Sequence, residues 1–423
     1  MDETLSATET IGTPLQVQDS AWLRAAKVMA LVGGVLAILV GLASGILYLL
    51  FAALPAGMIG QRTMGSVAVS FAALVLGATL GGGLVFHAIM ALRSRSSFRL
   101  SLPSPLWFML AFGLVLALGA TAPGPIRDSK FVFPIFYFLG IGLPVVVVLS
   151  AVQRRLGRRG LSGSWREAIL QLSSGALIST SSAMLLEAAV VVFLIVLVVL
   201  MVTLAPDVAT RWQGWLPDLK SLSRTAQPSD FEALLSSPAV LGLAFFVLAI
   251  AAPLIEEAVK AIGVLFMVYR RPSPQQALWW GLLGGAGFTL TEGLLNGSIS
   301  LGQMSWSTLA LIRVGTAVMH CTTGALMGLG WRSLVLERRI GEWLKRYVQA
   351  FLLHGFWNSL TLGLLAVPVL NGARVGELRP AGIAALLFLG LLLLLEVLGL
   401  AAILRGLTAP PPAHASEPNG ATP

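Results

Sequence analysis

Long apolar stretches, separated by short polar segments, run through most of the chain. Many of them approach or exceed the ~20 residues that a helix needs to cross a bilayer. Lipid leaves little alternative to a helix, because every backbone polar group must be satisfied within the membrane. The pattern therefore predicts an all-α fold, a polytopic transmembrane helix bundle. We expect ten spans, at about 25–53, 66–92, 105–122, 131–152, 174–205, 238–269, 275–298, 306–331, 346–370 and 380–404.

The basic residues between these stretches predict an orientation. With the N-terminus placed in the cytoplasm, the inner segments carry 18 Lys and Arg and the outer segments carry 8. Cytoplasmic loops of membrane proteins show this excess, so the count supports ten spans with both termini cytoplasmic. The net charge of +9 has the same origin, and it does not indicate a nucleic-acid partner.

Composition agrees with a membrane protein and suggests how the chain is divided. Charged residues are 11% of the chain, against roughly a quarter in soluble domains. Polar or Pro- and Ala-rich composition without an apolar period predicts disordered tails at both ends. We expect the following parts: tail 1–20, a four-span region of unknown role at 21–170, a fifth span with an outer loop at 171–236, a core that carries the chemistry at 237–371, the tenth span at 372–407, and tail 408–423.

Ionisable side chains inside a membrane are costly and mark functional sites by default. In this chain they are concentrated in the second half, where the polar set comprises Glu256, Glu257, Lys260, Glu292, Arg313, His320, His354 and Asn358. Two other intramembrane acids, Glu187 and Glu396, belong to no recognisable pattern, and we interpret both as structural or interfacial.

The segment LIEEAVK places two carboxylates before one ammonium. Glu256 and Glu257 precede Lys260 by four and three residues, so one carboxylate can pair with Lys260 while the other points elsewhere. A structural ion pair beside a kink at Pro253 explains the motif equally well by itself. Residues 237–269 would form a helix of about 50 Å against a core of about 30 Å, so this segment either tilts or breaks near Pro253.

Each of the next three predicted helices also carries its polar residues on one face. The spacings are four residues from Phe288 to Glu292, seven from Arg313 to His320, and four from His354 to Asn358. Glycines accompany these residues as packing devices that let helices approach closely, at Gly281, Gly284, Gly285, Gly287, Gly324 and Gly328.

Together these faces supply the groups of a hydrolytic metal site. Imidazole and carboxylate are the usual ligands of catalytic zinc, and we expect Glu292, His320 and His354 either to bind such a metal or to orient the attacking water. A remaining carboxylate, Glu256 or Glu257, is then the general base, and Asn358 the oxyanion donor. The sequence contains no H-E-x-x-H motif. Its single cysteine also excludes a metal cluster built from cysteines. A proton-coupled transporter or channel would also gather such groups at mid-membrane, and a scaffold without catalysis is a third possibility.

The ordered motifs resemble the PrsW family of intramembrane proteases, which is similar to type II CAAX prenyl endopeptidases and bacterial immunity-type membrane proteases. They are E-E-x-x-K at Glu256–Lys260, G-F-x-x-x-E ending at Glu292, Arg313 followed by His320, and H-x-x-x-N at His354–Asn358. The resemblance covers residues 237–370. PrsW relatives commonly follow the third Glu with Asn, whereas this chain has Gly293, and Asn296 one turn later is the expected substitute.

The resemblance implies an integral protein of the bacterial plasma membrane that cleaves membrane-anchored proteins. Its expected partners are the lipid bilayer and a single-span membrane protein, in the family's namesake an anti-sigma factor. The expected cofactor is a divalent metal, zinc in the first place, although water activated by glutamate without a metal stays open. The catalytic set it implies is Glu256, Glu257, Lys260, Glu292 and Asn358.

Overall fold

The protein is almost wholly helical in the computed structural model, which describes residues 21–54, 61–123, 129–157, 163–204, 238–300, 306–370 and 380–408. Within these residues no strand forms, and a single bridge pairs Arg99 with Ser164. The α-helices are α1 (Ala21–Ala53), α2 (Gln61–Leu76), α3 (Gly82–Leu92), α4 (Pro105–Thr121), α6 (Phe133–Gly157), α7 (Trp165–Ser173), α8 (Thr180–Leu204), α12 (Pro238–Phe245), α13 (Ala252–Val259), α14 (Gly263–Met267), α15 (Pro274–Ser300), α16 (Trp306–Glu337), α17 (Ile340–Leu370) and α18 (Pro380–Thr408). Three π-helical segments, η2 (Gly77–Gly81), η3 (Ser174–Ser179) and η4 (Phe246–Ala251), and one 3-10 turn, η5 (Val268–Arg270), connect some of them.

The polytopic helix bundle is confirmed, but the count of ten spans is not. Among the described residues seven helical stretches are long and apolar enough to cross a membrane, at Leu23–Ala53, Met64–Leu92, Phe133–Gly157, Trp165–Leu197, Leu241–Arg270, Trp306–Glu337 and Leu387–Arg405. Helices also form at the other three expected positions. Of these, α4 has only 17 residues, or about 26 Å. The helices α15 and α17 have 27 and 31 residues and are long enough to cross a membrane, but neither is among the seven.

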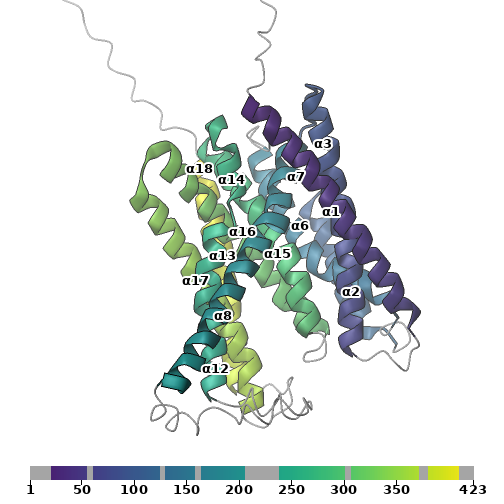
Figure 1. Cartoon of the computed structure of the whole chain (residues 1–423), viewed down its shortest axis with the longest axis vertical. Helices are drawn as coiled ribbons and strands as arrows, with labels where there is room; N and C mark the ends of the chain where they lie inside the picture. The colour runs from purple at the N-terminus through teal and green to yellow at the C-terminus, as the bar shows by residue number, and fades with distance from the viewer. Residues whose placement is uncertain are drawn as a thin grey trace, which may run out of the picture.

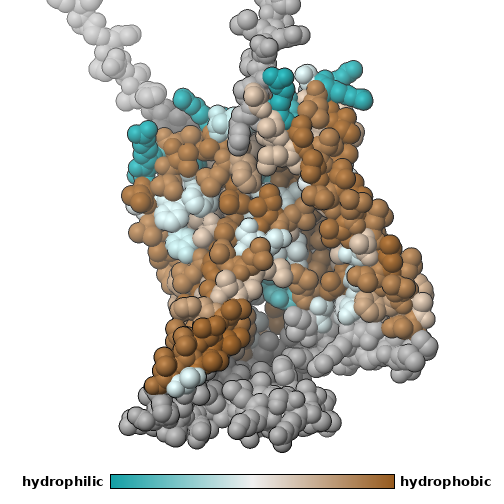
Figure 2. All heavy atoms as spheres, viewed as in Figure 1, coloured by the Kyte–Doolittle hydropathy of each residue, from teal (hydrophilic) through white to brown (hydrophobic). Residues whose placement is uncertain are grey.

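The helices pack side by side with α15 and α16 in the middle of the bundle (Figure 1). In this view α1, α2 and α3 lie to the right, and α17 and α18 lie to the left. The start of α1 and the end of α18 lie at the same end of the bundle. Hydrophobic residues cover most of the visible face, while hydrophilic residues gather at its upper end (Figure 2). Such an apolar belt is what a bilayer requires of the lipid-facing surface.

The first helices pack directly on the centre of the bundle. Both α2 and α6 contact α15, and α6 also contacts α16. Tyr137 of α6 is fully buried and donates its hydroxyl hydrogen to the carbonyl of Leu294 in α15. The ring of Trp306, at the start of α16, lies against Gly119 of α4 and Gly140 of α6. The N-terminal helices therefore support the side of α15 that faces away from α17.

Glycines bring α15 and α16 into backbone contact, as the sequence predicts for packing devices. A Cβ atom on Gly285 would overlap the carbonyl oxygen of His320, and one on Gly281 would overlap that of Gly324. Only glycine permits this approach, since any larger residue would force the two helices apart. His320 is thereby held close to the residues of α15.

The segment between residues 238 and 270 is helical but irregular in two places. It begins as α12, passes through the π-helical η4, and continues as α13, in which Pro253 occupies the first turn. Proline lacks a backbone N–H and displaces the preceding turn, which explains the π-helical geometry before it. The helix ends at Lys260, where a turn leads into α14. The break therefore follows the double glutamate, about two turns beyond the position near Pro253 that the sequence suggested.

The two predicted tails and most of the outer loop, residues 205–237, lie outside the described residues. The proposed division of the chain at 170, 236 and 371 stays a prediction. The contacts of α2 and α6 with α15 and α16 show that the first helices and the core form one packed bundle.

Candidate active site

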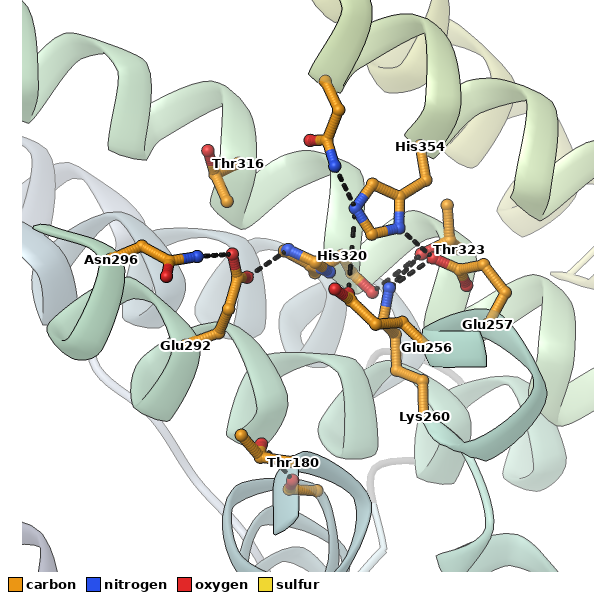
Figure 3. A network of polar contacts seen from close by, with 12 residues as sticks. Thr180, Glu256, Glu257, Lys260, Glu292, Asn296, Thr316, His320, Thr323 and His354 are labelled. Atoms are coloured by element: carbon orange, nitrogen blue, oxygen red, sulfur yellow. Dashed lines mark hydrogen bonds and ion pairs between the residues drawn. The ribbon is translucent and has the colours of Figure 1, made fainter. Parts of the chain in front are cut away.

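A buried chain of polar contacts joins the E-E-x-x-K motif to α17 (Figure 3). Lys260 and Glu257 are both fully buried, and the Lys260 ammonium donates to Glu257 Oε1. The same carboxylate oxygen lies 2.8 Å from Nδ1 of His354. Because this carboxylate accepts from Nδ1, the other ring nitrogen of His354 is left with its lone pair. The Lys260–Glu257–His354 contacts thus fix both the orientation and the tautomer of this imidazole.

Lys260 is held by three helices besides its own. Its ammonium lies 3.3 Å from the hydroxyl of Thr323 in α16 and 5.1 Å from the centre of the Phe288 ring in α15. The hydroxyl of Ser179 donates to the Lys260 carbonyl, which the end of α13 leaves without a helical partner. A buried charge is tolerated only when it is paired and hydrogen-bonded, and these contacts meet that requirement.

Glu256 points away from Lys260 toward the two imidazoles. Its Oε2 atom lies 3.7 Å from His354 Nε2 and has no hydrogen-bond partner. Glu256, His320 and His354 each offer one ligand atom, and these three atoms lie within 4.8 Å of one another. The His320 and His354 rings approach edge to face, with centroids 4.9 Å apart. The two adjacent glutamates therefore have different surroundings: Glu257 contacts both the Lys260 ammonium and His354, whereas Glu256 faces the two imidazoles.

Glu292 approaches His320 from the opposite side (Figure 3). Its Oε2 atom lies 2.7 Å from His320 Nε2, at ion-pair distance but outside hydrogen-bonding angles. The amide of Asn296 donates to Glu292 Oε1 at 2.6 Å, so Asn296 makes the contact expected of it in place of the residue at 293. Arg313 is buried beside Gly293, and its Nη1 atom lies 3.9 Å from where a Cβ on that glycine would be.

Asn358 is used to hold the site together. Its amide nitrogen donates to the carbonyl of Leu248 at 2.8 Å and lies 3.2 Å from His354 Nε2. Leu248 belongs to the π-helical η4. The Tyr347 hydroxyl makes a similar contact, donating to the carbonyl of Leu254 at 2.7 Å. The oxyanion role of Asn358 stays a prediction, because its amide nitrogen already contacts the Leu248 carbonyl and His354 Nε2.

The donor atoms of the site fit a divalent metal. Three buried polar atoms have no partner, namely Glu256 Oε2, Glu257 Oε2 and His320 Nδ1, while Glu292 Oε2 and His320 Nε2 face each other at 2.7 Å outside hydrogen-bonding angles. Unsatisfied buried polar atoms cost free energy unless something binds them. Nitrogen and oxygen donors of this kind are the ones that zinc takes in catalytic sites. Of the three predicted ligands, His320 and His354 belong to the close group of three, whose third member is Glu256. The third predicted ligand, Glu292, lies 2.7 Å from His320.

The structure brings together all eight polar residues that the sequence singled out, from α13, α15, α16 and α17. Two participants were missed. Thr323 follows His320 by three residues, so its place on the same helix face was readable from the spacing. Glu187 of α8 lies within electrostatic reach of Glu256 and Glu292, and only its position as an acid inside an apolar span hinted at this. Glu396 is buried in α18 without a hydrogen-bond partner and lies within electrostatic reach of Glu257 and Lys260.

The family comparison agrees with this geometry. The model of the family described as PrsW family intramembrane metalloprotease matches residues 163–395, more than half of the chain. The match begins with α7 and includes α8, so it extends well beyond the residues that carry the motifs. Neither the curated proteins nor the solved structures contain a significant match. With its apolar spans and its buried carboxylate and imidazole site, the chain is an integral membrane protein and an enzyme that belongs to the PrsW family of intramembrane metalloproteases.

Proposed function

We propose that this protease cleaves single-span membrane proteins with a divalent metal, zinc in the first place, held by Glu256, His320 and His354. The observation that carries the proposal is the convergence of these three ligand atoms within 4.8 Å in a buried site built from α13, α16 and α17. A metal bound there would polarise a peptide carbonyl and lower the pKa of a water molecule. This assignment replaces Glu292 with Glu256 in the ligand set expected from the sequence.

Glu257 and Lys260 are positioning residues in this scheme. A histidine that binds metal through one nitrogen almost always gives its other N–H to a carboxylate or carbonyl, which sets the ring and its tautomer. Glu257 Oε1 does this for His354 Nδ1 at 2.8 Å. Lys260 neutralises Glu257, so the carboxylate can stay ionised at full burial. The functional pair of glutamates therefore divides into an outer ligand, Glu256, and an inner support, Glu257.

Glu292 is the general base that we propose for water activation. Its side chain is 20% exposed, whereas those of Glu256 and Glu257 are 8% and 0% exposed. It is thus the carboxylate that water and substrate reach most easily, and the Asn296 amide holds it toward His320. A base must lie within hydrogen-bonding reach of the proton it removes, and Glu292 borders the same imidazole as the proposed metal.

The position of Glu292 along α15 indicates where a substrate is cut. Glu292 lies 18 residues after Pro274, or about 27 Å along the helix axis. Asn296, one turn further, is exposed. With the first turn of α15 placed at the cytoplasmic side, the site opens in the outer half of the membrane. A membrane-anchored regulator such as an anti-sigma factor, cut near its outer end, is the substrate class that fits the family resemblance.

A proton-coupled transporter is not favoured. Its predicted break at Pro253 is absent, since α13 continues through this proline from η4. The carboxylates are also engaged with imidazoles and Lys260 rather than spaced along a path.

The test compares three matched Glu→Gln variants, which remove one charge each without changing side-chain size. The native protein should bind about one zinc per chain when it is purified and analysed by mass spectrometry. Glu256→Gln should lose both zinc and proteolysis, whereas Glu292→Gln should keep zinc and lose proteolysis. Glu342→Gln serves as the control, because Glu342 lies in the first turn of α17 and pairs with Arg339 outside the site, and it should keep both. Proteolysis is followed as membrane-protein fragments in membranes containing each variant.

Two results would overturn the proposal. If the native protein binds no zinc and Glu256→Gln retains cleavage, the metal assignment fails. If Glu292→Gln loses zinc while Glu256→Gln keeps it, the two carboxylates have exchanged roles, and the ligand set is Glu292, His320 and His354.

A further inference from the structure

A hollow at one end of the bundle shares no residue with the active site. It has a volume of about 330 Å³ and lies where the end of α16 and the start of α17 meet the start of α15 and the end of α18. Its charged lining consists of Arg332, Arg339, Arg346, Glu337 and Glu342, and we call it the arginine hollow. Hydrophilic residues gather at this end of the bundle (Figure 2), which the basic residues of the sequence predict to be cytoplasmic.

Two glutamates hold two of the three arginines. Glu337 pairs with Arg332 and lies 3.8 Å from Arg339, and Arg339 lies 3.5 Å from Glu342. Arg332 also donates from Nε to the carbonyl of Pro272 at 2.8 Å, which ties α16 to the segment that precedes α15. These contacts fix the walls of the arginine hollow and balance two of its three positive charges.

Arg346 is the third arginine, and it makes no ion pair within the part of the chain that the structure describes. Its guanidinium donates to the neutral side chain of Gln349 at 3.4 Å. Its Cβ packs against α16 at Gly330, where an added Cβ would lie 3.3 Å away. The stem of Arg346 is therefore fixed while its charge is available to a ligand, and the arginine hollow has a net charge of +1.

Apolar and aromatic residues place the arginine hollow at the surface of the membrane. Leu329 and Ile403 line it and pack against the main hydrophobic core of the bundle. On the same two helices that carry the arginines, Trp343 stacks on Tyr347 with ring centroids 5.5 Å apart and lies 5.6 Å from Trp331. Trp and Tyr gather where a membrane meets water, at the level of the lipid headgroups. The hollow thus combines charged walls at headgroup depth with an apolar floor.

We infer that the arginine hollow binds the headgroup of an anionic phospholipid, with the phosphate at Arg346 and the apolar part of the lipid against Leu329 and Ile403. A guanidinium donates two parallel hydrogen bonds to a phosphate, and basic pockets between transmembrane helices bind such headgroups. A phosphodiester carries one negative charge, which matches the net charge of the hollow. A soluble phosphate would leave the apolar floor uncovered, so the lipid is the better fit. The inference does not depend on the metal assignment.

The experiment titrates the purified full-length protein, in an uncharged detergent, with phosphatidylglycerol and counts bound lipid by native mass spectrometry. Phosphatidylcholine is the reference, because it has the same phosphate with a compensating choline cation, and phosphatidylglycerol should bind about 10-fold more tightly. Arg346→Gln should weaken phosphatidylglycerol binding about fivefold, the effect of one basic residue beside an anionic headgroup. Lys345→Gln removes the same charge one residue earlier, outside the hollow, and should bind within about twofold of the native protein. Glu337→Gln removes a competing carboxylate and should strengthen binding about fivefold.

The outcomes separate a lipid site from general surface charge. Equal affinity for the two lipids, or equal losses in Arg346→Gln and Lys345→Gln, would overturn the inference. Displacement of phosphatidylglycerol by an equal concentration of inorganic phosphate would also overturn it, because the hollow would then bind a soluble anion. If Arg346→Gln does not fold, Arg346→Lys takes its place: it keeps the charge, loses the paired hydrogen bonds, and should bind about threefold more weakly.

Discussion

Replacing Gly285 by alanine tests whether the contact between α15 and α16 sets the position of His320. A Cβ at residue 285 would overlap the carbonyl oxygen of His320, and the carbonyl carbon would lie 2.9 Å away, half an ångström closer than ordinary contact at 3.4 Å. Both obstructing atoms belong to the backbone, so no side-chain rotation relieves the overlap. The two helices must move apart, by roughly 1 Å, a displacement of the size that costs about 100-fold in catalysis.

The magnitudes follow from this displacement. Overpacking a well-packed interior costs about 1–3 kcal/mol, so the free energy of unfolding in detergent should fall by that amount. Zinc affinity should fall about 10- to 100-fold, as it does when the support of a ligand is disturbed. Both quantities are measured on the same purified sample, by denaturant titration and by competition with a chelator.

Gly363→Ala is the matched control, because Gly363 lies inside helix α17 with no heavy atom within 4 Å of a Cβ. Alanine is favoured over glycine in a helix interior by about 1 kcal/mol, so this variant should be as stable as the native protein or more so. Native stability and native zinc affinity in Gly285→Ala would refute the reasoning, because they would show that a Cβ fits at residue 285 without separating α15 from α16.

Three further predictions concern the polar contacts. Lys260→Met leaves Glu257 buried without its cation, and should lower the free energy of unfolding by about 3–5 kcal/mol in denaturant titration; a loss below 1 kcal/mol would mean that the pair is not needed for stability. Asn358→Leu leaves the Leu248 carbonyl without its donor and should cost about 1–3 kcal/mol in the same titration, and an unchanged midpoint would contradict this. Thr323→Val removes the hydroxyl 3.3 Å from Lys260 and should cost about 0.5–1.5 kcal/mol, with zinc content retained.

The helical membrane fold and the polar set were predictable from the sequence because both depend on local rules. Long apolar stretches dictate helices in lipid, and a spacing of three or four residues places side chains on one helix face. The pairing of Lys260 with Glu257 lies within one turn of helix, and the Asn296 contact with Glu292 also spans one turn. Contacts of this range need no knowledge of how helices are arranged.

The different roles that we propose for the two adjacent glutamates could be assigned only from the tertiary structure. By sequence alone, Glu256 and Glu257 are equivalent partners for Lys260. They were distinguished only when α17 placed His354 against Glu257 and when α16 placed His320 beside Glu256. The span count also required the structure, because helices form at all ten expected positions but only seven stretches of the described residues are long and apolar enough to cross a membrane.

Sequence by itself determined which residues are polar inside the membrane and which of them share a helix face. Only the tertiary structure decided which faces meet, and it placed Glu187, 69 residues before Glu256 in the chain, within electrostatic reach of that residue. The physical reason is that contacts between helices follow from close packing over the whole bundle, as at Gly285 against His320. A local sequence pattern shows which face of a helix is polar, but it does not show which distant helix packs against that face.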